Sequence, residues 1–233
     1  MKPILYFFIL IMFFFETCLG TKNRMLFWRR DSGSADNFRK KVKSNAIQWI
    51  QVNTYDSTWN LKGKELICSG SPVGVIRTAN EYENFHLHIE WKHNKAGGNS
   101  GVFVWSKAVP SPNRLPDGVE AQMLELEWIR LHTKEGNTPP EARVHGEMFG
   151  MGGVQIVADN PSGNKSFPVE FRCKGKGEWN TYDLVCVDGT IKLAVNGKFV
   201  NGLSKSSQQK GFICLESEGS DISFRNIRVT ILP

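Results

Sequence analysis

Two short runs of this chain alternate polar with apolar side chains, and their polar residues could do chemistry on a rigid surface. The runs are Asn99-Ser100-Gly101-Val102-Phe103 and Gly118-Val119-Glu120-Ala121-Gln122-Met123. Because alternate residues of a strand share a face, Glu120 and Gln122 should project side by side, with the apolar residues of their run packed behind them. A carboxylate beside an amide can position a polyhydroxylated ligand and remove a proton from it. A half-buried strand with a solvated polar face would show the same pattern.

Strands are expected to hold these residues in place. Asp188-Gly189 and Asn196-Gly197 are strong hairpin turns, and no amphipathic helix of three turns is expected after residue 60. The pattern predicts an all-β fold, an antiparallel jelly-roll sandwich of two curved sheets in one domain over residues 46–233. The expected strands are 66–68, 74–77, 85–91, 102–105, 119–126, 154–157, 167–173, 180–187, 190–195, 198–200, 212–216 and 222–231.

Two long irregular stretches interrupt the strands. Residues 105–118 contain Pro110, Pro112 and Pro116, and residues 129–153 contain Pro139-Pro140 and a glycine-rich end. Loops of this length inside a compact domain are more often functional than idle. In a sandwich they are expected at the rim of a concave sheet, where ligands are enclosed.

The N-terminus has the form of a secretory signal over residues 1–20. One lysine precedes an apolar run from Ile4 to Phe15, and the segment ends in the small residue Gly20. The run is shorter than the roughly 20 apolar residues of a membrane span, so no transmembrane span is expected in the mature protein. We therefore expect export to the periplasm or beyond. Cys18 leaves a lipid anchor open, although the residues before it make a poor lipobox.

The formal net charge of +6 belongs to one segment. Residues 22–45 hold eight basic residues against two acidic ones, and the charges balance from residue 46 onward. We expect residues 21–45 to be a basic linker or leader segment. The folded body is therefore not expected to bind nucleic acid.

Four cysteines follow the expected cleavage site: Cys68, Cys173, Cys186 and Cys214. In an exported chain they permit two disulfides in three connectivities. Cys186 and Cys214 lie within apolar strand patterns, where free buried cysteine is equally compatible. The spacing of cysteines and histidines does not predict a structural zinc site.

Seven short motifs along residues 46–232 resemble, in order, the 3-keto-disaccharide hydrolase domain family. They are Tyr82-x-x-Phe85-x-Leu87, Asn99-Ser100-Gly101-Val102, Gly118-x-Glu120-x-Gln122, Gly177-Glu178-Trp179-Asn180, Val195-Asn196-Gly197, Gly211-x-Ile213-x-Leu215-Glu216-Ser217-Glu218-Gly219 and Phe224-Arg225-Asn226-Ile227. The resemblance implies a concanavalin-like lectin/glucanase sandwich in an exported bacterial protein. It also implies cleavage of glycosides whose sugar ring is oxidised at C3, with a carbohydrate as the partner.

Such a reaction assigns roles to the polar residues. A C3 ketone acidifies the C2 hydrogen, so a base can remove it, the C1 substituent can leave, and water can add. Glu120 is the candidate base, and His145 is a candidate acid or second base. Gln122 and Asn99 are candidates for binding ring hydroxyls or the carbonyl. Arg172 or Arg225 could stabilise the enolate charge.

Structural roles remain open for several of these residues. His145 on its glycine-rich loop could be a surface or capping residue, and Asn99 could be a turn residue. Arg225 could simply tie the last strand into the fold. Trp105 could stack on a sugar face, whereas Trp179 is more typical of core or turn packing.

Three alternatives complete the expectations. The run from Glu120 to Glu125 is similar to the E-x-D-x-x-E strand of sandwich-fold glucanases, which carry out two-carboxylate hydrolysis. In this chain the amide Gln122 stands where that motif has its middle acid. A regular strand also points Glu125 away from Glu120 unless a bulge intervenes. No cofactor is expected, although Asp117, Glu120 and Glu147 leave a divalent cation open. The same face could also belong to a non-catalytic, lectin-like carbohydrate-binding module.

Overall fold

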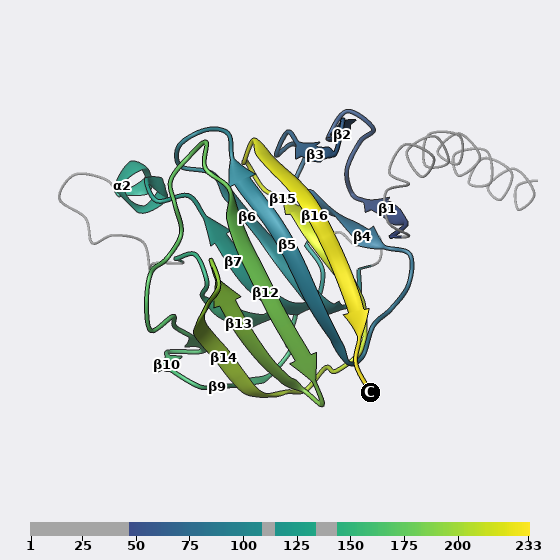
Figure 1. The fold of residues 1–233 in the computed structure, drawn as a ribbon, viewed down its shortest axis with the longest axis vertical. Coiled ribbons are helices and arrows are strands. Elements are labelled where there is room, and N and C mark those ends of the chain that lie inside the picture. The colour runs from purple at the N-terminus through teal and green to yellow at the C-terminus, as the bar shows by residue number, and fades with distance from the viewer. Residues whose placement is uncertain (1–46, 109–114, 134–143) are drawn as a thin grey trace, which may run out of the picture.

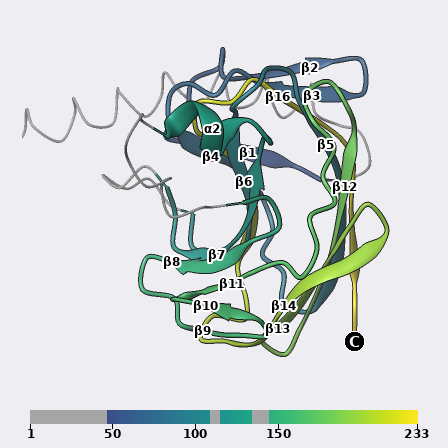
Figure 2. The same cartoon turned by 90° about the vertical axis from the view of Figure 1, so that its left-hand side faces the viewer.

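The computed structural model describes residues 47–108, 115–133 and 144–233. Within these residues, two antiparallel sheets of eight strands each pack face to face, as the edge-on view in Figure 2 shows. In strand order, the first sheet contains β1 (Trp49–Val52), β4 (Gly74–Thr78), β15 (Phe212–Ser217), β6 (Asn99–Ser106), β7 (Gly118–Leu124), β8 (Met148–Met151), β11 (Lys165–Ser166) and β10 (Pro161–Ser162). The all-β sandwich is confirmed.

The second sheet lies in front in Figure 1, with the long strands β16, β5 and β12 side by side. In strand order it contains β2 (Trp59–Lys62), β3 (Glu65–Cys68), β16 (Ile222–Ile231), β5 (Phe85–His93), β12 (Asn180–Val187), β13 (Thr190–Val195), β14 (Lys198–Ser206) and β9 (Ile156–Ala158). The helix in the described residues is α2, one short turn at Trp128–His132.

The core lies between the sheets and follows from alternation along the strands. In β5 every second residue is buried, from Phe85 to His93, and the residues between are half-buried. β7 contributes Val119, Ala121 and Met123 to the same core. Because successive side chains point to opposite faces, the other residues of β7 must lie on the outer face of the first sheet.

The expected meander of β12, β13 and β14 is confirmed, and its turns explain why. Asp188 and Gly189 have φ values of 48° and 80°, and Asn196 and Gly197 have values of 49° and 78°. Two successive residues with positive φ make the turn type whose twist suits a hairpin. The residues after each turn then pair back along the previous strand.

The strand expected at residues 167–173 is wrong. Pro168 has no N–H to donate to a ladder, and Val169 and Phe171 expose 66% and 57% of their surface. The segment is instead attached by separate backbone hydrogen bonds, such as the one from the Val169 N–H to the Val200 carbonyl at 2.8 Å. Apolar content alone therefore did not make a strand here.

The other differences from the expected elements are additional short elements and shifted strand ends. The stretch 129–153, expected to be irregular, contains most of α2 and all of β8. The strand expected at 154–157 lies at Ile156–Ala158, and β7 ends at Leu124 rather than at residue 126. The short strands β1, β2, β10 and β11 were not expected.

The four cysteines in the described residues are free thiols. Cys186 and Cys214 are buried within strands, and burial raises the pKa of Cys214 to about 12. Such thiols are poor nucleophiles.

Within the described ranges, no helix is long and apolar enough to span a membrane, and no three His, Cys, Asp or Glu side chains are grouped to hold a metal ion. The expected signal at residues 1–20, the basic segment at 21–45, and Pro110, Pro112 and Pro139-Pro140 lie outside the described residues.

Candidate functional site

Glu120 and Gln122 lie side by side on the outer face of the first sheet, because the residues alternating with them in β7 face the core. Neither is solvated: Glu120 is 3% exposed and Gln122 is 1% exposed. The face-sharing prediction is confirmed, and the alternative of a solvated polar face is wrong. Burying a carboxylate away from water costs free energy unless neighbouring groups stabilise it. The burial of Glu120 therefore favours a functional role for this residue.

A row of directly paired residues crosses this face. Glu120 is paired with Phe103 of β6 on one side and with Phe149 of β8 on the other. Phe149 is paired in turn with Lys165 of β11. Since directly opposite residues share a face, aromatic residues flank Glu120 and a cation stands at the end of the row.

Gly101 provides the space for the Glu120 carboxylate. Gly101 is opposite Gln122 in the β6–β7 ladder. A Cβ atom built on Gly101 would lie 2.4 Å from Oε1 of Glu120 and 3.0 Å from its Cδ and Cγ. The Glu120 side chain therefore lies over the backbone of Gly101, and only glycine leaves room for this arrangement.

A second carboxylate approaches the same glycine from the other neighbouring strand. Leu215 of β15 pairs with Val102 of β6, which places Glu216 level with Gly101. Leu215 faces the core, so Glu216 is on the outer face, where it is fully buried. Glu120, Gln122 and Glu216 thus surround Gly101 on one surface.

Gln122 also ties the next segment to β7. Its N–H donates to the Glu147 carbonyl at 2.9 Å, and its carbonyl accepts from the Gly146 N–H at 2.8 Å. The Tyr182 hydroxyl donates to the same carbonyl from the core side at 2.6 Å. These bonds hold His145 and Glu147 beside β7, where Nζ of Lys165 lies 3.4 Å from Oε1 of Glu147.

His145 is buried, with 6% of its surface exposed. Its ring packs edge-on against Phe171 with centroids 5.6 Å apart, and its Nε2 has no hydrogen-bond partner within the described part of the chain. Burial lowers the pKa of His145 to about 4. The imidazole is therefore neutral at pH 7 and is not a protonated acid, and the same low pKa makes it only a weak base.

Asn99 lies on the same face, two residues before Gly101. Its Nδ2 donates to Oε2 of Glu218, and its Oδ1 is buried without a partner among the described residues. Asn99 is thus within the polar face, although its amide nitrogen is already engaged.

Trp105 does not lie on this face, which corrects the expectation that it stacks on a sugar. It has a φ of 52° at a register shift between β6 and β15, and this bulge reverses the alternation. Its ring is fully buried in the core, and its indole N–H donates to the Glu83 carbonyl at 2.8 Å.

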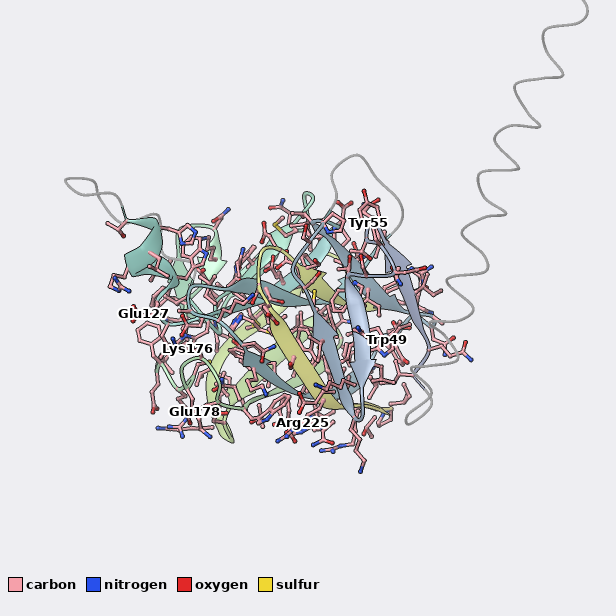
Figure 3. The ribbon with its side chains drawn as sticks, turned by 90° about the horizontal axis from the view of Figure 1, so that it is seen from above. Trp49, Tyr55, Glu127, Lys176, Glu178 and Arg225 are labelled. Carbon is pink, nitrogen blue, oxygen red and sulfur yellow. The ribbon has the colours of Figure 1, made fainter. Side chains whose placement is uncertain are left out.

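The two arginines lie elsewhere. Arg172 is bound to Glu170 at 2.7 Å and to the Val195 carbonyl of the second sheet at 3.2 Å. Arg225 of β16 pairs with Glu90 at 2.6 Å and stacks on Trp179 at 3.8 Å. Figure 3 shows Arg225 at the periphery of the molecule. The structure therefore does not bring either arginine to Glu120, and Arg225 ties the last strand to β5.

Glu125 also serves the fold. Its carboxylate accepts backbone N–H bonds from Gly97 at 2.6 Å, Glu127 at 2.9 Å and Lys176 at 3.2 Å; Glu127 and Lys176 lie beside α2 in Figure 3. Although burial opposes ionisation, these bonds lower the pKa of Glu125. Because its carboxylate is held by three backbone N–H groups, Glu125 is not the second carboxylate that two-carboxylate glycoside hydrolysis would need beside Glu120.

Two cavities lie at the end of β7 and β8, beyond the polar face. One of about 470 Å³ is bounded by Lys107, Asp117 and the loop 207–210. The other, of about 610 Å³, is bounded by residues 153–158 and the β10–β11 turn. Glu120, Gln122 and His145 line neither cavity. The candidate site is defined by the side chains of the buried polar face.

Sequence reasoning missed Lys165, the contribution of Glu216 and the reason for a glycine at 101. Lys165 stands in a two-residue strand with no pattern of its own. Its position follows from the pairing of β7, β8 and β11, which no local signal predicts.

Comparisons with known proteins agree with this architecture. A Bacteroides thetaiotaomicron protein named 3-keto-disaccharide hydrolase is 26% identical over 190 residues, which is 68% of this chain and 62% of that protein. This chain thus spans less than two thirds of that relative's length.

The solved structures share the fold. A Parabacteroides distasonis protein proposed to be a glycosyl hydrolase superposes with a TM-score of 0.60 at 20% identity, over 79% of this chain and 88% of that one. The carbohydrate-binding module CBM66 from Bacillus subtilis superposes with a TM-score of 0.53 at 11% identity, over 78% and 94% of the two chains.

The exoplasmic/lumenal domain of VIP36 in its Ca²⁺- and mannose-bound form gives a TM-score of 0.51 at 12% identity, over 82% of this chain and 86% of that one. At these identities the three structures support the sandwich fold alone. A model of the 3-keto-alpha-glucoside-1,2-lyase-like domain matches residues 28–230. The chain therefore belongs to the family of 3-keto-alpha-glucoside-1,2-lyase-like domains.

Proposed function

We propose that this protein cleaves glycosides whose sugar is oxidised at C3, using Glu120 as the base. The observation that carries the proposal is the Glu120 carboxylate held over Gly101, on one face with Gln122, Glu147 and Lys165. Family membership supports the carbohydrate class of the substrate.

The proposed reaction starts with proton transfer from C2 to the Glu120 carboxylate. The C2–H electron pair forms the C2–C3 double bond of an enolate, and the C3 oxygen takes the negative charge. The electrons then return to form a C1–C2 double bond as the C1–O bond breaks, and the departing oxygen takes up a proton. The C3 ketone re-forms in that step, and water then adds its oxygen to C1 and a proton to C2, which saturates the C1–C2 double bond and completes net hydrolysis.

The residues around Glu120 suit the remaining tasks. Gln122 can position ring hydroxyls or the carbonyl, and Asn99 is on the same face. Burial lowers the pKa of His145 to about 4, so its imidazole is neutral and can serve as a hydrogen-bond acceptor or a weak second base. Burial of the face strengthens electrostatic interactions within it.

Purified protein incubated with 3-keto-trehalose or 3-keto-lactose tests this proposal. We expect release of the free sugars, measured by chromatography, and no release from the unoxidised disaccharides, which lack the acidic C2 hydrogen. Binding of either sugar by calorimetry without any release would instead support a lectin-like carbohydrate-binding module and contradict the enzymatic proposal.

We also propose that the protein is exported, from the signal-like composition of residues 1–20. Fractionation of expressing cells, followed by N-terminal sequencing, should find the protein outside the cytoplasm and cleaved near Gly20. An intact N-terminus in the cytoplasm would contradict export.

A further inference from the structure

The proposed reaction needs a positive charge near the C3 oxygen, and the two arginines suggested by sequence do not supply it. Arg172 is bound to Glu170 and the second sheet, and Arg225 lies on the far side of the sandwich against Trp179. The geometry instead leads to Lys165, which shares the cross-strand row of Glu120.

Lys165 reaches the site from two strands away. It is directly opposite Phe149, which is directly opposite Glu120. With neighbouring strands about 4.8 Å apart, the two backbones are separated by about 10 Å, and the Phe149 side chain stands between them. Arg77 also belongs to this row, but Cys214 and Phe103 separate it from Glu120.

The environment of the Lys165 ammonium is that of a functional charge rather than a solvated surface lysine. Its side chain is only 12% exposed and lies 3.4 Å from Oε1 of Glu147. The same nitrogen is 5.5 Å from the centre of the Phe149 ring. A charge in such a partly dry site acts on a neighbouring oxyanion more strongly than it would in water.

We propose that Lys165 is the catalytic cation that stabilises the enolate oxygen at C3, with Glu147 holding its ammonium in place. The inference rests on the proposed function and adds the group that offsets the charge of the enolate. When Glu120 takes the C2 proton, the electron pair moves towards the C3 oxygen, and the ammonium of Lys165 offsets the charge that develops there. Lys165 transfers no proton in this step and forms no covalent bond.

Two substitutions at this position test the proposal, with turnover and the exchange of the C2 hydrogen in D₂O as readouts. Lys165→Gln should lower kcat by roughly 10²–10³, with a parallel loss of C2 exchange, because one donor to an oxyanion is removed. Lys165→Arg should retain activity within about tenfold, because it keeps the charge. Lys192→Gln is the matched control, since Lys192 pairs with Asp159 away from this face, and should behave as wild type.

A merely structural role would lower the thermal unfolding midpoint of Lys165→Gln while leaving kcat per folded molecule unchanged, and that result would overturn the inference. The inference would also be overturned if Lys165→Gln and Lys165→Arg were both inactive and borohydride trapped the substrate on Lys165 of the wild type. The lysine would then act covalently. Wild-type turnover with a fully active Lys165→Gln refutes only this inference. The absence of turnover by the wild type refutes the proposed function itself.

Discussion

Replacing Gly101 by alanine should displace Glu120 while leaving the sandwich folded. The new Cβ would stand 2.4 Å from Oε1 of Glu120, whereas ordinary contacts begin at 3.4 Å. The carboxylate must therefore move by about 1 Å, and a misplacement of that size costs on the order of 10²-fold in rate. We expect kcat for a 3-keto-glycoside to fall by about this factor.

The cost in stability should be smaller. Alanine gains roughly 0.5–1 kcal/mol over glycine in a strand, and crowding of the buried carboxylate costs about 1–3 kcal/mol. The net change of at most about 2.5 kcal/mol should lower the unfolding midpoint by less than about 10 °C. Thermal unfolding by circular dichroism measures this separately from the kinetic assay.

Two further variants sharpen this test. Gly175→Ala is the matched control, because the nearest atoms to its Cβ would be 3.8 Å away, and it should retain full activity. Combining Gly101→Ala with Glu120→Asp shortens the displaced side chain and should relieve the crowding, so the unfolding midpoint should recover. Full activity in Gly101→Ala would refute the assignment of Glu120 as the positioned base.

Three other predictions follow from the same contacts. Burial lowers the pKa of His93 and of His145 from 6.5 to about 4, so the unfolded state binds more protons between these values. Stability measured by urea unfolding should be fully present above pH 6.5 and fall by about 3 kcal/mol per histidine as the pH drops to 4; a flat profile would contradict the burial argument. Gln122→Ala should raise KM about tenfold in steady-state assays with kcat little changed, since a positioning contact is lost, and a selective loss of kcat would place Gln122 in proton transfer. Glu125→Gln should cost about 1–3 kcal/mol in urea unfolding, because three backbone N–H groups lose a charged acceptor, and a drop in kcat beyond tenfold would contradict its structural role.

Local signals in the sequence predicted the parts of the fold that depend on neighbouring residues. The hairpins at Asp188-Gly189 and Asn196-Gly197 followed from residues that tolerate positive φ. The shared face of Glu120 and Gln122 followed from the period of a strand. These features need no knowledge of distant partners.

The rest of the site depends on which strands become neighbours. Glu216 and Lys165 reach the face of Glu120 through the strand order β15, β6, β7, β8 and β11, and no local pattern encodes that order. Trp105 was misplaced because a single residue with φ of 52° reversed the alternation. A sequence period cannot reveal such a bulge.

Isotope exchange at C2 is the sharpest measurement of whether Glu120 removes the proton from that carbon. Wild-type protein and Glu120→Gln are each incubated in D₂O with a 3-keto-glycoside, and deuterium at C2 of recovered substrate and product is followed by NMR. Glutamine preserves the shape of the side chain but cannot accept the proton, so exchange and turnover should both fall by roughly 10²–10⁴ while sugar binding persists. Undiminished exchange in Glu120→Gln would contradict the account.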